Sequence, residues 1–360
     1  MSPLRGETID PLTVGVCHIS CRCVRSTWLC GKDPVTGKDY EHRRQWVSDR
    51  LALQASLFAI EIAFDAVMVN HTHNVSVNRP EVVATWSDEE VVRRNLMINQ
   101  LPRCFNGNLR KPSAVEIRIE ITLSDEQRMQ DYRIRLSDPS WFMKQLNEYL
   151  ARRINKEDGV TGRVWEGPFK CRRLEDESAL LVCGIYVDLN QVRSGEVKTP
   201  EESTYTSAYL RIEGAKFLAE HADYINQNDD RIYRERPDGW LAELTLEEGP
   251  NVDARNSVLP SKFPRLTDKG LLPMRLKDYL ELLDWTGRNQ VSEKRAAIPD
   301  HLASILERLH VNAENWFETI DNFDTLFGRA VGRTATMINR AKASGRGWIR
   351  GARNCANAFT

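Results

Sequence analysis

The order in which strand-like and helix-like segments follow one another constrains the fold of this chain more than any other feature of its sequence. Alternating or β-branched apolar patterns predict extended segments at 13–24, 61–69, 71–77 and 162–175. Apolar residues at helical spacing predict helices at 40–60, 87–99, 138–159 and 176–195. The polar stretch 102–136 has no clear period and is interpreted as an insertion. This order is typical of an α+β protein whose antiparallel or mixed sheet carries helices on one face.

Residues at the helix ends support these boundaries. Pro139 stands near the first turn of the third helix and Gly159 follows its end, as is typical of helix termini. The fourth helix is expected to begin at Asp176 or Ser178 and to stop at Gly195.

The chain divides into three parts by pattern. Residues 1–212 hold the strands and helices just described, and the turn-rich residues 213–265 are interpreted as an irregular linker. Residues 266–360 are helical again and predict a C-terminal helical domain with a basic tail. From Leu326 to Thr360 there are seven basic residues and no acidic ones, which a net charge of −1 for the whole chain conceals. Such an end suits a polyanionic partner such as DNA, or is a solvated helix face.

Composition excludes several classes of protein. With 41% hydrophobic and 28% charged residues the chain is typical of a globular protein rather than a disordered one. It holds no run of about 18 or more apolar residues, so no membrane span is expected. The N-terminus lacks the pattern of a signal peptide, so we expect a cytoplasmic protein whose eight cysteines are reduced.

Two histidines stand one residue apart at the start of the third predicted strand. Residues i and i+2 of a strand share a face, so His71 and His73 lie on the side that also carries Val75. The alternating residues, such as Thr72 and Asn74, make the other face polar. The histidines are therefore expected under a helix, either as ordinary core residues or as half of a metal site.

The helix predicted at 176–195 supplies a partner for these histidines. Tyr186 and Asn190 are four residues apart and project from one side of a helix. If that side packs on the histidine strand, two imidazoles and an amide oxygen can hold a divalent cation, Mg²⁺ or Mn²⁺, with open positions for a phosphate. Tyr186 is then a candidate nucleophile toward a phosphodiester. The alternative is an ordinary core tyrosine.

Five segments resemble a known family. The strand AVMVNHTHNVSV resembles the His-hydrophobic-His strand of the single-tyrosine HUH transposases. The segments RVWEGPFK and YVDLNQVRSG resemble the motif that precedes the tyrosine helix and the tyrosine helix itself in one branch, the REP-associated tyrosine transposases. HISCRCVRSTWLCG and EHRRQWVSDRL fit the N-terminal part of the same branch, so the resemblance spans roughly residues 14–210. This branch is related to the insertion-sequence-200-like enzymes.

The resemblance implies a fold, an activity and a set of site residues. The fold is a ferredoxin-like antiparallel-sheet sandwich, the HUH catalytic domain, here assigned to residues 1–212. The motif histidines fall on His71 and His73 as metal ligands, the amide ligand falls on Asn190, and the nucleophile falls on Tyr186. Such enzymes cut single-stranded or hairpin-forming DNA, leave a 5′-phosphotyrosine link and a free 3′-hydroxyl, and rejoin strands. They are prokaryotic and act in the cytoplasm, on the nucleoid.

Basic residues near the expected cleft are candidates for contacts with the DNA backbone, although solvated faces explain them nearly as well. They are Arg22, Arg25, Lys144, Arg152, Arg153, Lys170, Arg172 and Arg173.

The chain departs from the family pattern at three positions. Thr72 stands between the histidines, Pro168 replaces an arginine, and Gln191 replaces a proline and is expected to lengthen the helix. The loss of charge at Pro168 leaves open a domesticated hairpin-binding protein that no longer cuts. A metal-dependent hydrolase without covalent catalysis also stays open, as does the choice between a monomer and a homodimer.

Overall fold

A five-stranded mixed sheet lies at the centre of the computed structural model, which describes residues 8–24, 28–104, 112–221, 236–245, 269–290, 297–347 and 349–360. Its strands are β1 (Gly15–Arg22), β2 (Ile60–Val67), β3 (His71–Asn78), β4 (Lys170–Leu174) and β5 (Ala330–Val331). They are ordered β2-β3-β1-β4-β5. Neighbours among the first four strands are antiparallel, whereas β5 is parallel to β4. The α+β class and the mixed sheet predicted from the sequence are therefore confirmed.

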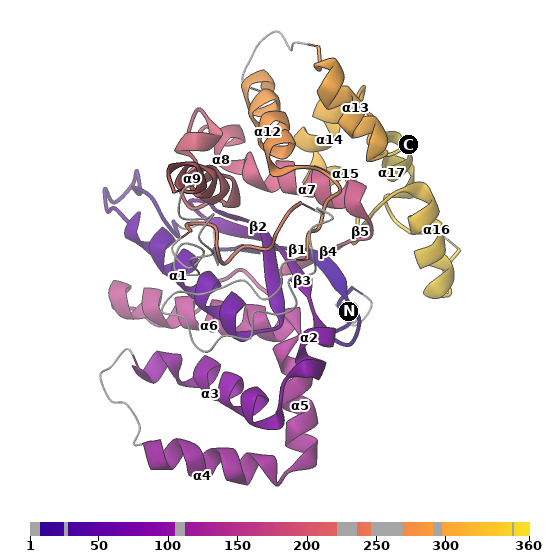
Figure 1. The fold of residues 1–360 in the computed structure, drawn as a ribbon. Coiled ribbons are helices and arrows are strands. Elements are labelled where there is room, and N and C mark those ends of the chain that lie inside the picture. Colours follow the sequence, from indigo (N-terminus) through magenta and orange to yellow (C-terminus); the bar gives the residue numbers. More distant parts are fainter. Residues whose placement is uncertain are drawn as a thin grey trace.

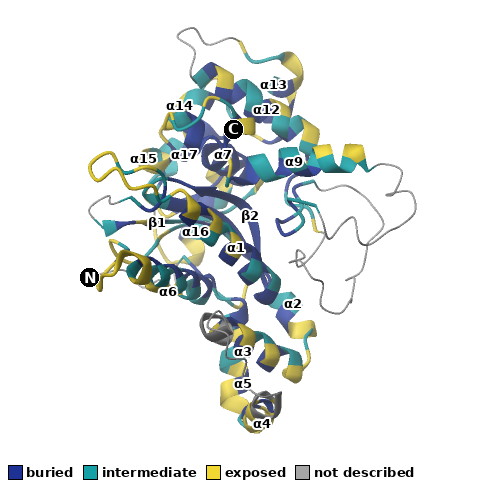
Figure 2. Cartoon of the chain, turned by 90° about the vertical axis from the view of Figure 1, so that its left-hand side faces the viewer, coloured by how far each residue is buried: buried dark blue, intermediate teal, exposed yellow. Residues whose placement is uncertain are grey.

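Helices cover both faces of the sheet. The helices α1 (His42–Leu57) and α6 (Pro139–Asp158) pack against each other on one side, and α7 (Glu177–Asp188) lies across the other (Figure 1). The expectation of helices on one face only was wrong. The polar side of β3 is buried as well, and Asn74 donates to the sulfur of Met143 on α6 at 3.5 Å. Figure 2 shows this buried centre, with exposed residues on the outer helix faces and on the loops.

The described parts of the stretch interpreted as an insertion, 102–104 and 112–136, are mainly helical. Four helices form a lobe beyond α6: α2 (Pro80–Thr85), α3 (Asp88–Cys104), α4 (Pro112–Leu123) and α5 (Glu126–Leu136) (Figure 1). The period of α4 is hard to detect because Ile117 and Ile121 are exposed whereas Ile119 is buried. The start of α5 is fixed by Asp125, whose side chain accepts from the backbone N–H of Arg128.

The ends of α6 agree with the sequence. The side chain of Asp138 accepts from the N–H of Ser140, and Gly159 ends the helix with a left-handed backbone at φ 65°. Asp176 likewise caps α7 by accepting from the N–H of Ala179, which decides between the two candidate caps.

The single helix predicted at 176–195 is interrupted. It is divided at Leu189 into α7 and the short helix α8 (Asn190–Arg193). Tertiary hydrogen bonds account for the interruption. Asp188 accepts from Tyr279 at 2.6 Å, and Gln191 donates to the carbonyl of Val67 at 3.1 Å and to that of Thr204 at 2.9 Å. Gln191 therefore anchors the chain to the sheet and does not lengthen the helix.

The described C-terminal elements share a hydrophobic core with α7. They are α12 (Leu276–Gln290), α13 (Asp300–Arg308), α14 (Trp316–Asp321), α15 (Phe323–Leu326), α16 (Thr334–Ala343) and α17 (Ala352–Ala358). Ser178 on α7 donates to the carbonyl of Leu309 at 2.6 Å, and the fifth strand pairs with β4 in the central sheet. This end of the chain therefore completes the core around α7.

The predicted boundary after residue 212 falls inside α9 (Ser207–Glu220), which follows the short 3₁₀ helix Pro200–Glu202. Within the predicted linker, residues 236–245 lie beside β2, where Ala242 donates to the carbonyl of Ile62 at 2.8 Å. Residues 222–235 and 246–265 of that linker lie outside the described residues. The division into three domains stays a prediction. No helix in the described ranges is both long and apolar enough to cross a membrane.

Candidate functional site

Strand β3 and helix α7 bring the predicted histidines and tyrosine together. The rings of His71 and His73 are 4.8 Å apart between centroids, and the ring of Tyr186 stands edge-on to His73 at 5.7 Å. Both histidines face α7 because alternate residues of β3 share that side of the sheet. His73 and Tyr186 are each 2% exposed.

A third histidine completes this group. His18 on β1 is 3% exposed, and its Nε2 atom lies 2.9 Å from Nδ1 of His73. The two rings stack almost in parallel, 5.1 Å apart with 7° between their planes. Tyr186 stands edge-on to His18 as well, at 6.0 Å. The imidazoles of His18, His71 and His73 are called the histidine cluster below.

The histidine cluster is neutral at physiological pH. Burial lowers the pKa of His18 to about 3, with a further contribution from the positive charge of Arg172. Burial and the charge of Arg22 lower the pKa of His71 to about 4. Burial and the two neighbouring imidazoles hold the pKa of His73 well below its usual value. Each imidazole therefore offers one lone pair, which is the form that binds a metal.

Helix α15 covers the hydroxyl of Tyr186. That hydroxyl donates to Oδ2 of Asp324 at 2.8 Å, and the ring of Phe323 stacks on the tyrosine ring at 4.9 Å. The guanidinium of Arg193 lies 4.3 Å from the centre of the same ring. Burial raises the pKa of Tyr186 to about 12, and the charge of Asp324 adds to this effect.

Asp324 lies at the solvent side of the site. Its side chain is 52% exposed and forms an ion pair with Arg172 at 3.1 Å. Burial opposes ionisation of this carboxyl, but the neighbouring imidazoles, the hydrogen bond from Tyr186 and the charge of Arg172 together hold its pKa well below the usual range. The negatively charged carboxylate of Asp324 therefore stands between the hydroxyl of Tyr186 and the guanidinium of Arg172.

Asn190 is linked to Tyr186 through Arg193. The Oδ1 atom of Asn190 accepts from Arg193 at 2.9 Å, and the same guanidinium covers the tyrosine ring. The Nδ2 atom of Asn190 is buried and has no hydrogen-bond partner in the described part of the chain. The amide oxygen keeps a second lone pair.

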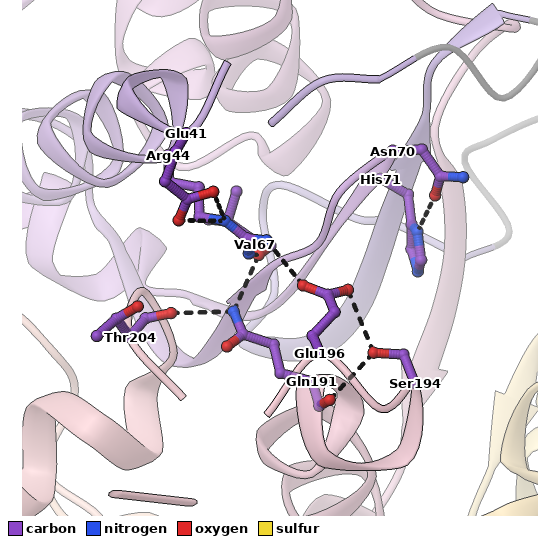
Figure 3. A network of polar contacts seen from close by, with 9 residues as sticks. All are labelled: Glu41, Arg44, Val67, Asn70, His71, Gln191, Ser194, Glu196 and Thr204. Atoms are coloured by element: carbon purple, nitrogen blue, oxygen red, sulfur yellow. Dashed lines mark hydrogen bonds and ion pairs between the residues drawn. The ribbon is translucent and has the colours of Figure 1, made fainter. Parts of the chain in front are cut away.

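A polar network fixes this helix end against the turn that precedes His71 (Figure 3). Gln191 and Arg44 both donate to the carbonyl of Val67, the last residue of β2, and Arg44 also pairs with Glu196 at 2.7 Å. In the same view the Nδ1 atom of His71 bonds to Oδ1 of Asn70 at 2.7 Å. The bonds to Val67 therefore tie the chain after Tyr186 to the end of β2, from which the turn leads into the histidine strand.

The hydrogen bonding of the two histidines on β3 fits a divalent metal. The Nε2 atom of His73 is buried and finds no hydrogen-bond partner among the residues that the structure describes, whereas its Nδ1 atom is paired with His18. His71 is likewise paired through Nδ1, to Asn70. An imidazole held at one nitrogen and free at the other is the usual arrangement of a metal-binding histidine. Within the described ranges, no cluster of three or more His, Cys, Asp or Glu side chains has the arrangement of a complete metal site.

The predicted DNA contacts divide into two groups by whether a neighbouring acidic or phenolic group holds them. Arg22, Lys144 and Lys170 are exposed and form no ion pair with the described residues. The other four described residues are held: Arg152, which is also exposed, pairs with Glu148, Arg153 bonds to the hydroxyl of Tyr149, Arg172 pairs with Asp324, and Arg173 lies 3.5 Å from Glu175. Arg25 lies outside the described residues.

A surface pocket adjoins the first group. Trp141, Lys144, Pro168 and Phe169 line it, between the start of α6 and the loop that leads into β4. The ammonium group of Lys144 lies 4.3 Å from the centre of the Trp141 ring. The loop is tied to the histidine end of the sheet, because the N–H of Glu166 donates to the carbonyl of Arg22, whose register partner is His71. Aromatic and basic side chains of this kind suit an unpaired base and its phosphate.

Sequence reasoning missed His18, Phe323, Asp324 and Arg193. A signal for His18 exists, because it stands in a predicted strand with alternating residues. That signal needs the strand register, which pairs His18 with Val75 on the face of the histidines. No local signal exists for Asp324, since it reaches Tyr186 from 138 residues further along the chain.

Comparison with known proteins adds one distant likeness. No protein-family model matches the chain, and no curated protein matches it. Among solved structures, the chain is similar to that of a REP-associated tyrosine transposase bound to a REP hairpin. The likeness covers 54% of this chain and 76% of that chain, at 11% sequence identity and a TM-score of 0.31. Such a likeness establishes neither a family nor a function, so the assignment of function rests on the geometry of the site.

Proposed function

We propose that this protein is a metal-dependent endonuclease and strand transferase for single-stranded, hairpin-forming DNA, a transposase that acts through a 5′-phosphotyrosine intermediate. The observation that carries the proposal is the contact of Tyr186 with His73, at 5.7 Å between ring centres, beside His71. A phenol next to two neutral imidazoles is the minimum set for metal-assisted attack on a phosphodiester. The family that the sequence resembles uses the same set.

The reaction transfers a phosphoryl link without any change of oxidation state. The oxygen of Tyr186 forms a bond to phosphorus while the bond from phosphorus to the 3′ oxygen breaks. The phenol proton leaves to water, and the departing 3′ oxygen takes a proton from water to become a hydroxyl. Attack by a 3′-hydroxyl on the phosphotyrosine reverses these steps and rejoins strands.

The residues that would hold the metal are His71 and His73, with the amide oxygen of Asn190. A bound Mg²⁺ or Mn²⁺ supplies a positive charge that polarises the scissile phosphate. Tyr186 must also be exposed to react, because its hydroxyl now donates to Asp324 and its ring lies under Phe323. DNA binding therefore requires that the Phe323 ring leave the tyrosine ring and that the hydroxyl turn from Asp324 toward the phosphate.

The DNA strand is proposed to run along the histidine end of the sheet. Arg22 and Lys170 are exposed there, at the ends of two neighbouring strands, and Lys144 and Trp141 continue the basic and aromatic surface into the pocket. The chain order β1-α1-β2-β3-α6-β4, with strands ordered β2-β3-β1-β4, supports a ferredoxin-like core for this site. A cytoplasmic, nucleoid-associated place in a prokaryotic cell belongs to the same proposal.

A second candidate is a domesticated hairpin-binding protein that no longer cuts. The burial of Tyr186 under Phe323 and Asp324 favours it, since a binding protein needs no access to the hydroxyl. Pro168, in place of a basic residue, is compatible with either candidate.

An assay of end-labelled hairpin oligonucleotides separates these candidates. The full chain is incubated with Mg²⁺ or Mn²⁺, and cleavage and denaturation-resistant protein–DNA bands are followed with and without chelator. We expect both products from the wild type and neither from Tyr186→Phe, while Tyr209→Phe stays active. Cleavage by Tyr186→Phe indicates a hydrolase without a covalent step, and tight binding without cleavage by the wild type indicates the binding protein.

A further inference from the structure

We propose that His18 is a positioning residue, which accepts a hydrogen bond from Nδ1 of His73 and so holds the lone pair of His73 Nε2 ready for a metal ion. This inference rests on the proposed function, because it concerns the metal that His71 and His73 would hold. Its starting point is the 2.9 Å contact between two stacked imidazoles, both almost fully buried.

The direction of this hydrogen bond follows from the remaining nitrogen of His73. A neutral imidazole carries one proton, so either Nδ1 or Nε2 is the donor. If His18 donated to Nδ1, the N–H at Nε2 of His73 would be buried without an acceptor, because that atom has no partner among the described residues. If His73 donates from Nδ1, the unpaired group is a lone pair, and a bound cation satisfies it.

The same arrangement recurs at the neighbouring histidine. His71 is paired through Nδ1 with Oδ1 of Asn70 at 2.7 Å, and an amide oxygen accepts but never donates. His71 is therefore a donor at Nδ1 and keeps its lone pair on Nε2. With His18 as the acceptor for His73, both histidines of the strand present the same nitrogen.

The surroundings of His18 suit a rigid acceptor. Its ring stands edge-on to Phe323 at 5.8 Å and to Tyr186 at 6.0 Å, while the backbone register places it between Val75 on β3 and Arg172 on β4. Two charged groups act on the pKa of His18: Arg172 lowers it and Asp324 raises it. A ring held on these sides cannot turn away from His73 without disturbing the core.

The test uses variants that keep or remove the acceptor. His18→Gln places an amide oxygen near the former Nε2, whereas His18→Phe keeps a ring without an acceptor. His18→Leu serves as a second apolar variant should the first one not fold. His301→Phe, at an exposed histidine on α13 that pairs with Glu281, controls for loss of a histidine elsewhere.

Two measurements are made on each folded full-length variant. Long-range proton–nitrogen NMR spectra of metal-free protein report which nitrogen of His73 carries the proton. We expect Nδ1–H in the wild type and in His18→Gln, and a shift toward Nε2–H in His18→Phe. Electron paramagnetic resonance of free Mn²⁺ reports metal affinity, which His18→Phe should weaken about 10- to 100-fold and His18→Gln should largely restore.

Failure of this inference and failure of the proposed function give different results. An unchanged His73 tautomer and unchanged Mn²⁺ affinity in His18→Phe would overturn the positioning role while leaving the metal site intact. A wild type that binds no Mn²⁺, or that binds it equally well after His71→Ala and His73→Ala, would overturn the metal site itself. A tautomer shift in His18→Phe, if the wild type binds no Mn²⁺, would likewise overturn the metal site.

Discussion

Asp324 favours the protonated phenol of Tyr186, which is a poor nucleophile, and the variant Asp324→Asn measures the size of this effect on the rate. The pKa of Tyr186 is raised from 10.0 to about 12, first by burial and then by the charge of Asp324. Two pKa units correspond to about 2.7 kcal/mol against the phenolate, or about a 100-fold smaller phenolate fraction at neutral pH. Burial is the larger cause, and water screens a half-exposed carboxylate. Removing the charge should therefore raise the phenolate fraction of Tyr186 by about two- to tenfold.

The assay is the initial rate of covalent adduct formation between pH 7 and 9, at saturating hairpin oligonucleotide. The rate should rise in Asp324→Asn by that factor at each pH, and Tyr186 should titrate at lower pH in the NMR spectrum of its ring carbon. Thr325→Ala, at the next and exposed position of α15, is the matched control. A fall in rate, with a normal Tyr186 titration, would refute this reasoning and would make Asp324 a group that the reaction needs.

Three further predictions concern stability and DNA binding. Because burial lowers the pKa of His18 to about 3, the unfolded chain gains a proton there between about pH 6.5 and 3 that the folded chain does not, so the contribution of His18 to stability falls by about 1.4 kcal/mol for each unit that the pH is lowered. The thermal unfolding temperature of His18→Gln should therefore fall less steeply than that of the wild type as pH is lowered from 7 to 4.5. Equal slopes for the two proteins would contradict this. Burial and the charge of Asp188 raise the pKa of Asp65 to about 8, so the contribution of Asp65 to wild-type stability decreases as pH rises from about 4 to 8, opposite in sign to that of His18. Asp65→Asn should gain on the wild type over that range, and a constant difference in unfolding free energy would contradict the shift. Lys144→Ala should lower the salt dependence of hairpin affinity by about one phosphate contact, whereas Lys216→Ala on α9 should not; equal slopes would remove Lys144 from the DNA path.

Much of the fold could be predicted from local sequence. Strand alternation and helical spacing identified the strands β1 to β3 and the helices α1, α6 and α7, because each of these carries apolar residues at the spacing of its element. Pro139 near the first turn and Gly159 past the end marked the ends of α6, and the structure adds the cap at Asp138. The number of helical layers could not be predicted, since Thr72, Asn74 and Ser76 look solvent-facing in sequence but are buried under α6 in the structure.

The site could be predicted only where its residues are local. His71 and His73 share a strand face, and Tyr186 stands one helical turn before Asn190, so spacing alone brings them into consideration. The interruption at Leu189 depends on tertiary hydrogen bonds of Asp188 and Gln191, which no local pattern records. The contribution of α15 likewise depends on how the C-terminal helices pack on α7.

The most direct test of the central claim is to locate the covalent bond. The adduct formed by the wild type with a hairpin oligonucleotide and Mn²⁺ is digested with nuclease and protease, and the modified peptide is sequenced by mass spectrometry. We predict a nucleotide joined through its 5′-phosphate to Tyr186, and no modified peptide when chelator is present. A modification on another residue, or cleavage with no modified peptide at all, would contradict the tyrosine mechanism.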